Sequence, residues 1–337
     1  MSEIIYQKIK GELVPKSGNE RGPNRRYHNV NGLTVEFTPE EEKERDREEQ
    51  EWEEQRPIRE AEARRQHEEF EKFKESLIYK VKLVAFMDVL GWAEATRDSK
   101  NDIESVKNLG LTLNISKSMG SRVKWMRDRE FPGDVNVSQF SDCIVISAEP
   151  TVLGKEELIR HVDWITRGFF SQQFLVRGSI VIGEIYHDQE MVFGPALVEA
   201  YKNERSRAKY PRIILQKELA DQWGQGDKYF DKDGSLIGRA KTWRMCPVDG
   251  EVYYDFLQPQ FARPGMSVNI TTLDAELGPV YEYLIKELCD TDKCEKVSAK
   301  LLWLANYYNA VVDEYPEYGG KKIEGTYGLI SVKALKA

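Results

Sequence analysis

Two aspartates stand at the ends of short apolar runs and form the strongest candidate for a chemical site. Asp88 follows the run 81–87, which only Lys82 interrupts, and Asp142 precedes the run 143–146. A carboxylate at the end of a buried strand is costly to desolvate unless a partner compensates its charge. Two such carboxylates on neighbouring strands indicate a shared divalent cation with oxygen ligands, and such cations commonly serve phosphate chemistry. Alternatively, Asp88 could cap a helix that starts near Gly91, and Asp142 alone could be an ordinary turn residue.

A third segment adds groups that suit a phosphate. Residues 176–184 read Val-Arg-Gly-Ser-Ile-Val-Ile-Gly-Glu, and the two glycines permit close approach of a ligand or of neighbouring backbone. Arg177 could contact phosphate or pair with a buried carboxylate. Gly194 precedes a proline and opens a helix whose first backbone amides suit a phosphate group. Glu204 in that helix is expected to face solvent. Basic residues follow on and after the helix: Lys202, Arg205, Arg207, Lys209 and Arg212.

Strands and helices alternate between residues 78 and 260, which predicts an α/β domain. The expected strands are 81–88, 135–139, 143–148, 174–183, 211–215 and 251–255. The expected helices lie near 92–98, 102–119, 155–170, 194–208 and 216–223. Two of the strands flank the short turn at Ser141-Asp142, which predicts a hairpin and argues against a purely parallel sheet. The segment 224–250 is rich in turn-forming residues, and its pattern predicts neither a helix nor a strand.

The segments on either side of this domain have different patterns. Residues 1–77 are polar, and Thr38 begins a capping box before a highly charged sequence that runs to Lys74. That sequence predicts a solvated helix that serves as a spacer or as an arm for a protein partner, and Pro57 should kink or break it. Residues 261–337 contain two amphipathic helical patterns. We therefore expect three parts, 1–77, 78–260 and 261–337.

Composition excludes several classes of protein. The formal net charge of −8 over 337 residues argues against nucleic-acid binding and against binding at membrane surfaces. The four cysteines match no zinc motif, and four histidines are too few for a His-rich metal site. No run approaches the length of a transmembrane helix, and residues 1–5 lack the layout of a signal peptide. We expect a reduced, cytoplasmic protein.

Taken in order, these motifs resemble the catalytic domain of class III nucleotide (adenylate/guanylate) cyclases. Asp88–Trp92 resembles the end of that family's first strand, where an aspartate precedes an apolar residue and then an aromatic one. Asp142 resembles the second aspartate of the family, at a hairpin tip. Arg177–Gly183 resembles an arginine-led strand that ends in glycine, and Phe193-Gly194 resembles the aromatic-glycine pair that opens a helix. The resemblance covers about residues 78–215.

The resemblance implies a ferredoxin-like palm, an α/β fold with a mixed sheet and helices on one face. It implies conversion of a nucleoside triphosphate to a cyclic nucleotide and pyrophosphate by a two-metal mechanism. Two Mg²⁺ or Mn²⁺ ions would be held by Asp88, Asp142 and the carbonyl of Val89. The implied substrate-binding residues are Arg177, Gly194, Arg207 and Arg212, and the implied catalytic residues are Lys202 and Arg205. A homodimer is also implied, because sites in this family are usually shared head to tail.

Four positions depart from the family pattern. An asparagine and an arginine of the family fall at Val198 and Lys202, and lysine keeps the charge but loses the planar fork. The purine-reading lysine and aspartate of adenylate cyclases fall at Ser138 and Met191, which argues against adenine recognition by that scheme.

Three functions therefore stay open. The first is a cyclase for another base, nearest in character to bacterial antiphage pyrimidine cyclases, in bacterial or phage-linked signalling or defence. The second is a catalytically degenerate cyclase-fold protein that binds nucleotide or acts as a scaffold. The third is a phage structural or assembly protein, because residues 35–65 are similar to the N-terminal part of small phage tail-assembly proteins.

Overall fold

In a computed structural model of the chain, the described residues are 5–9, 12–15, 27–30, 33–127, 135–223, 227–230, 236–240, 242–259, 272–290 and 293–324. The chain divides into two compact units, Met1–Leu77 and Ile78–Ala337. The additional boundary near residue 260 stays a prediction. Within the described ranges, none of the helices has the length and apolar composition needed to cross a bilayer.

The first unit consists of a small sheet and one long helix. The sheet has the order β2-β1-β4-β3. Its strands are β1 (Ile5–Ile9), β2 (Glu12–Pro15), β3 (Tyr27–Val30) and β4 (Leu33–Glu36). Helix α1 (Pro39–Ser76) begins at the predicted capping box, in which the Thr38 hydroxyl accepts from the backbone N–H of Glu41 and the Glu41 carboxylate accepts from that of Thr38. The helix contains no buried residue, which confirms the predicted solvated helix.

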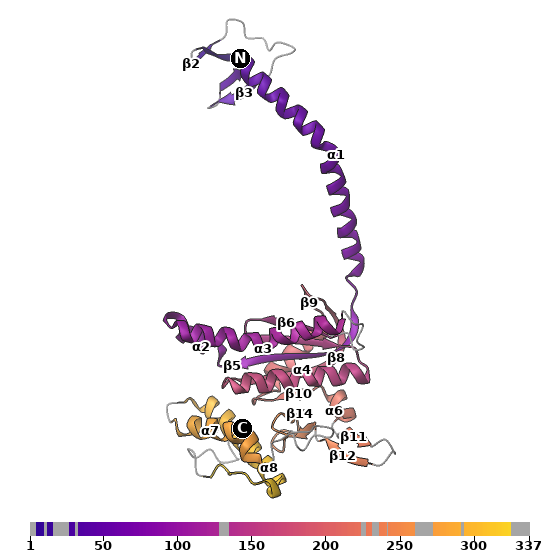
Figure 1. Cartoon of the computed structure of the whole chain (residues 1–337), viewed down its shortest axis with the longest axis vertical. Coiled ribbons are helices and arrows are strands. Elements are labelled where there is room, and N and C mark those ends of the chain that lie inside the picture. The colour runs from indigo at the N-terminus through magenta and orange to yellow at the C-terminus, as the bar shows by residue number, and fades with distance from the viewer. Residues whose placement is uncertain are drawn as a thin grey trace. The chain divides into compact units, whose positions relative to one another are not determined.

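Helix α1 continues through Pro57, so Pro57 does not break it, and a kink at this residue stays a prediction (Figure 1). Proline removes one backbone donor and crowds the preceding turn. Nearby, the guanidinium of Arg59 donates a hydrogen bond to the backbone carbonyl of Trp52. The same guanidinium lies 4.3 Å from the centroid of the Trp52 ring. Surface ion pairs three or four residues apart support the helix on either side, and each adds a few tenths of a kcal/mol.

The second unit is built on a β-α-β-β-α-β core. Its elements are β5 (Lys80–Leu90), α2 (Trp92–Asp98), the 3₁₀ turn η1 (Ser99–Asn101), α3 (Ile103–Arg127), β6 (Asn136–Phe140), β7 (Cys143–Ala148), α4 (Val152–Ser171) and β8 (Leu175–His187). Strands β6, β7, β5 and β8 are neighbours in that order and pair antiparallel. This is the ferredoxin-like strand order, which confirms the predicted palm.

Further elements extend the sheet beyond β8 and add helices. They are β9 (Val192–Phe193), α5 (Pro195–Ser206), β10 (Ile213–Leu215), α6 (Lys217–Trp223), β11 (Asp227–Phe230), β12 (Leu236–Ala240), β13 (Trp243–Met245), β14 (Val252–Tyr254), α7 (Leu273–Cys289), α8 (Glu295–Glu314) and the 3₁₀ turn η3 (Pro316–Tyr318). Strand β10 pairs parallel with β8, and β14 and β13 follow it antiparallel, so the sheet is mixed. Strands β11 and β12 form a separate ribbon.

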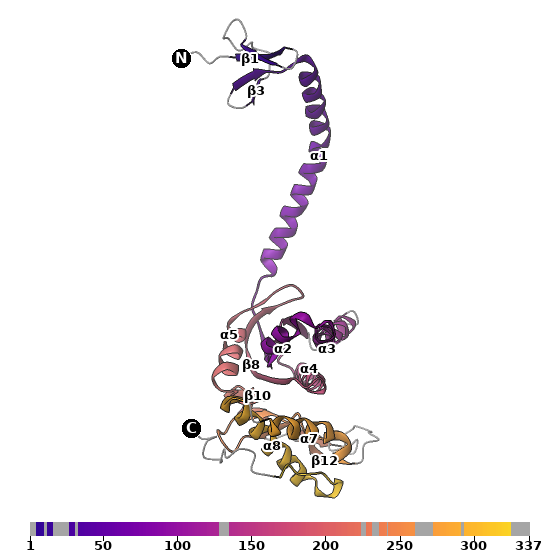
Figure 2. The same ribbon diagram turned by 90° about the vertical axis from the view of Figure 1, so that its left-hand side faces the viewer.

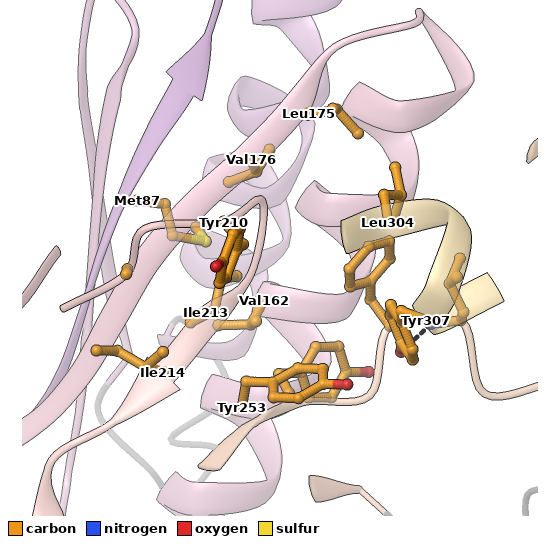
Figure 3. Close-up of a cluster of buried hydrophobic side chains, with 14 of the residues drawn as sticks. Met87, Val162, Leu175, Val176, Tyr210, Ile213, Ile214, Tyr253, Leu304 and Tyr307 are labelled. Atoms are coloured by element: carbon orange, nitrogen blue, oxygen red, sulfur yellow. Dashed lines mark hydrogen bonds between the residues drawn. The ribbon is translucent and has the colours of Figure 1, made fainter. Parts of the chain in front are cut away.

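Alternation along β5 gives the sheet two buried faces. Leu83, Ala85 and Met87 belong to the larger hydrophobic cluster, and Val84 and Phe86 belong to the smaller one. Helices α3 and α4 cover the larger cluster, as the palm predicts, and α5 covers the other face (Figure 2). Side chains from α8, β8, β10 and β14 also join the larger cluster (Figure 3). The C-terminal helices therefore share one core with the sheet.

The interior of α4 gives a direct test of this packing. Phe169 is fully buried against the sheet, so Phe169→Ala should lower the free energy of unfolding by about 3–5 kcal/mol, measured by urea denaturation. Trp164 lies on the same helix but is 56% exposed, and Trp164→Ala should change stability by less than about 0.5 kcal/mol. Equal losses in the two variants would contradict the assigned face.

Candidate functional site

The hairpin between β6 and β7 brings the two aspartates together. Ser141 takes a left-handed backbone conformation (φ 56°), which turns the chain between the strands. The N–H of Val89 then donates to the carbonyl of Asp142 over 3.0 Å, and Asp88 pairs in register with Cys143. Asp142 therefore lies at the end of β5 beside Asp88 and Val89, where the sequence placed the metal site.

Asp88 does not cap the following helix. The N-cap position of α2 is Gly91, with φ of 81°, and no side chain donates to or accepts from that cap. The carboxylate of Asp88 instead faces β8, whose Arg177 is its register partner. One Nη of Arg177 lies 3.2 Å from Oδ2 of Asp88. Between the two alternatives for Asp88, the geometry excludes the helix cap.

Arg177 also binds Glu204, which the sequence assigned to solvent. Glu204 on α5 is 3% exposed and forms an ion pair with the same Nη2 that contacts Asp88. The expectation of an exposed Glu204 is wrong, because α5 packs with this side against the sheet beside the buried Ala196 and Ala200. Arg177 thus pairs with two carboxylates, and a contact with phosphate stays a prediction.

The acidic groups at this site repel one another in a partly desolvated setting. Burial raises the pKa of Asp88, the charge of Asp142 raises it further, and Arg177 opposes both. Burial likewise raises the pKa of Glu204, with Asp88 adding and Arg177 opposing. Burial together with the charges of Asp142 and Asp88 raises the pKa of the Cys143 thiol to about 11. The site is therefore short of positive charge.

A lysine from the C-terminal helices reaches the same charges. Lys300 on α8 stands one helical turn before the buried Leu304, and its charge lowers the pKa of Asp88. Burial and the charge of Arg177 lower the pKa of Lys300 itself, while Asp88 opposes this. Sequence reasoning missed Lys300, because its only local signal was a position on the apolar face of an amphipathic helix.

Two of the basic residues on α5 remain exposed. Lys202 and Arg205, the expected catalytic residues, both lie on the solvent side of the helix. Arg205 donates to the Tyr201 hydroxyl over 3.2 Å and lowers the pKa of Glu204 through its charge. The structure does not join either residue to Asp88 or Asp142 by a hydrogen bond or an ion pair within its described part. Their catalytic role stays a prediction.

Two further basic residues, Arg207 and Arg212, have carboxylate partners within the chain. Arg207 lies 2.9 and 2.6 Å from the two carboxylate oxygens of Glu251. Arg212 is fully buried and bonded to Asp249. Neither arginine is brought to the acidic pair by these contacts, so a role for them in substrate binding stays a prediction.

Gly194 has a structural reason to be glycine. It occupies the N-cap of α5 with φ of 144°, a conformation that residues with a Cβ rarely adopt. A Cβ at this position would lie 2.8 Å from the Cα of Ile185 and 2.9 Å from the carbonyl oxygen of Glu184. Close approach to β8 therefore accounts for the glycine, and its contact with a substrate phosphate stays a prediction.

The donor set at Asp88 and Asp142 fits a divalent cation that prefers oxygen. No group of three or more His, Cys, Asp and Glu side chains gathers around a common point in the described residues. Mg²⁺ does not require such a cage, since it is commonly held by one or two carboxylates together with water and substrate phosphates. The carboxylates of Asp88 and Asp142, whose charges repel each other, satisfy that requirement, and a cation would relieve their repulsion.

Comparison with known proteins gives structural likenesses only. No family model matches the chain, and no curated protein sequence matches it. One similar structure is a class III adenylyl cyclase-like ATP-binding protein from Pseudomonas aeruginosa, with 10% identity and a TM-score of 0.32, covering 42% of this chain and 34% of that protein. Another is the guanylyl cyclase domain of the RhoGC fusion protein from the aquatic fungus Blastocladiella emersonii, with 12% identity and a TM-score of 0.33, covering 52% and 94%.

A bacterial light-regulated adenylyl cyclase is also similar, with 14% identity and a TM-score of 0.34, covering 60% of this chain and 65% of that protein. The chain thus spans about a third of the ATP-binding protein's length and slightly less than two thirds of the light-regulated cyclase's. Likenesses at this level establish neither an activity nor a ligand for this chain.

The ion pairs of Arg177 give the first prediction about the site. Arg177→Met should destabilise the protein by about 3–5 kcal/mol at pH 7.5, because it leaves two partly buried carboxylates without a cation. Without Arg177 the folded-state pKa values of Asp88 and Glu204 rise further above their ordinary values of 3.8 and 4.5. The cost is therefore full at neutral pH and shrinks as the pH falls and both groups take up protons.

Urea denaturation at pH 7.5 and at pH 4 measures this difference. Arg97→Met is the matched control, because Arg97 is an exposed arginine on α2. A loss of stability in Arg177→Met that is the same at both pH values would contradict the electrostatic account.

Proposed function

We propose that this protein is a nucleotide cyclase of the class III type. The observation that supports the proposal is the convergence of Asp88 and Asp142 at one end of the central strands, beside Arg177. Two carboxylates in a site short of positive charge suit a cation-bound triphosphate better than they suit a free anion. The motif order along the sequence agrees with the same reaction.

In the proposed reaction, the ribose 3′-oxygen forms a bond to the α-phosphorus of a nucleoside triphosphate. The bond from that phosphorus to the bridging oxygen of the β-phosphate breaks, pyrophosphate leaves, and the hydroxyl proton passes to solvent. Asp88, Asp142 and the Val89 carbonyl would hold Mg²⁺ or Mn²⁺, which neutralises phosphate charge when bound. Arg177 positions Asp88 through its ion pair, and Lys202 and Arg205 are the exposed cations available to a triphosphate.

The base is proposed to be a pyrimidine. Ser138 stands where adenylate cyclases carry a purine-reading lysine, and its hydroxyl lies 2.9 Å from Nε2 of His187. Met191 stands at the aspartate position, and its side chain has no group that could accept a hydrogen bond strongly. A homodimer, a role in bacterial or phage-linked defence signalling and a protein partner for α1 belong to the same proposal.

A binding protein without turnover is the second candidate. Three observations favour it: Arg177 already pairs with two carboxylates, Arg207 and Arg212 are held by Glu251 and Asp249, and Val198 replaces a hydrogen-bonding residue. Such a protein would keep the palm and bind nucleotide through the acidic pair, but it would lack the groups that stabilise the transition state.

Pyrophosphate release in the presence of Mn²⁺ tests the enzyme. Each of the four nucleoside triphosphates is supplied in turn, and we expect turnover that favours UTP or CTP. Asp88→Ala and Asp142→Ala should each lower the rate by about 100-fold or more, since they remove a metal ligand. Asp98→Ala is the control, because Asp98 is exposed at the end of α2. A control that loses as much activity as the two variants would argue against the assigned site.

Thermal unfolding distinguishes the binding protein. A triphosphate at 100 times its dissociation constant stabilises the folded state by about 2.7 kcal/mol, which raises Tm by about 5–10 °C for a unit of this size. We expect the shift with Mn²⁺ present and its loss when EDTA removes the metal. A metal-dependent shift without turnover supports the binding protein. No shift with any triphosphate contradicts both candidates and favours a structural role without nucleotide affinity.

A further inference from the structure

A cavity of about 480 Å³ lies between strands β13 and β14 and helix α8. We propose that it is a binding site for a small, uncharged, planar heteroaromatic molecule with hydrogen-bond acceptors. Its volume falls within the range of known small-molecule sites, roughly 300–1,000 Å³. In the sheet, β10 and β8 stand between β14 and β5, which carries Asp88. The proposal therefore concerns a different site from the acidic pair and does not rest on the cyclase proposal.

Aromatic side chains form the walls of the cavity. Trp243, Tyr253, Trp303 and Tyr307 all line it, and each is at most 4% exposed. The Tyr253 and Tyr307 rings meet edge to face at 5.4 Å, and both are visible in Figure 3. A flat aromatic ligand would gain stacked or edge-to-face contacts with the parts of these rings that line the cavity.

These walls are held in place before any ligand arrives. Trp303 stacks on Tyr210 with ring centroids 5.3 Å apart and an interplanar angle of 3°. The Tyr307 hydroxyl donates to the carboxylate of Asp255 and accepts from the backbone N–H of Leu257 at 2.9 Å. Because the rings are fixed by partners outside the cavity, a ligand would not have to order them, and this reduces the cost of binding.

The charges around the cavity favour an uncharged ligand. Arg244 lines it, but its Nε lies 2.6 Å from Oδ2 of Asp255 and its Nη2 lies 2.6 Å from Oε2 of Glu314. Its positive charge is therefore already matched, and an anion gains little. A cation is disfavoured because the guanidinium of Arg212 already lies behind two of the walls, 5.5 Å from the Trp303 ring centroid and 5.8 Å from that of Tyr253.

A polar group of the lining explains why the ligand should carry acceptors. The amide of Asn306, an exposed residue of α8, belongs to the lining and has two N–H donors. A carbonyl oxygen or ring nitrogen of the ligand would accept a hydrogen bond from this amide.

Caffeine is a suitable probe, since it is uncharged and planar and carries two carbonyl acceptors. We expect saturable binding to the full-length protein in ligand-observed and protein-observed NMR titrations. Ala310 lines the cavity but is exposed, so Ala310→Trp should fill the cavity without removing a wall, and should weaken binding by about tenfold or more. Val297→Trp places the same ring on an exposed part of α8 outside the lining, and should change affinity by less than about twofold.

A second variant protects the test against misfolding. Asn306→Ala changes an exposed residue and should weaken caffeine binding by a few-fold while the melting temperature stays unchanged. Benzamidine and benzoate, a planar cation and a planar anion, should both bind more weakly than caffeine. Absence of saturable caffeine binding to the wild type, equal affinity in Ala310→Trp and Val297→Trp, or stronger binding of either charged probe would overturn the proposal. No nucleotide or metal is used, so these results are independent of the cyclase assays.

Discussion

The ion pairs of Arg177 are the interaction on which the centre of the second unit depends. This one guanidinium contacts Asp88 on the neighbouring strand and Glu204 on α5. Helix α5 covers the face of the sheet that carries the smaller hydrophobic cluster. Charges placed between packed elements are tolerated only when they are matched, because water can no longer screen them. The Arg177 side chain thus contributes to the register between β5 and β8, to the placement of α5 and to the orientation of the Asp88 carboxylate.

Local patterns allowed the sequence to predict the palm and its acidic pair. Strand patterns on both sides of Ser141-Asp142 predicted the hairpin, which places Asp142 at its tip. Pairing of β7 with β5 then brings Asp142 to Asp88. The burial of Glu204 and the approach of Lys300 could not be predicted, because each depends on contacts between segments distant in sequence. Strand β13 was missed for a related reason: three residues in a turn-rich segment carry no period, and their strand forms by pairing with β14.

The basic residues after α5 illustrate how tertiary partners decide the role of a charge. In sequence, Arg207 and Arg212 form part of one basic run with Lys202 and Arg205. In the fold, Glu251 pairs with Arg207, and Asp249 pairs with Arg212. Lys202 and Arg205 remain on the solvent side. A run of like charges therefore did not act as a unit, because the sheet beyond β8 brought carboxylates to Arg207 and Arg212.

Cys143 has a consequence for how the site withstands oxidants. With its thiol pKa near 11, owing to burial and the neighbouring carboxylates, the sulfur stays protonated at cellular pH. Peroxide and disulfides react with the thiolate and not with the neutral thiol. A sulfenate there would add a further negative charge beside two acids that already repel each other. Burial, together with the acidic pair, therefore keeps the Cys143 thiol in its less reactive, protonated form.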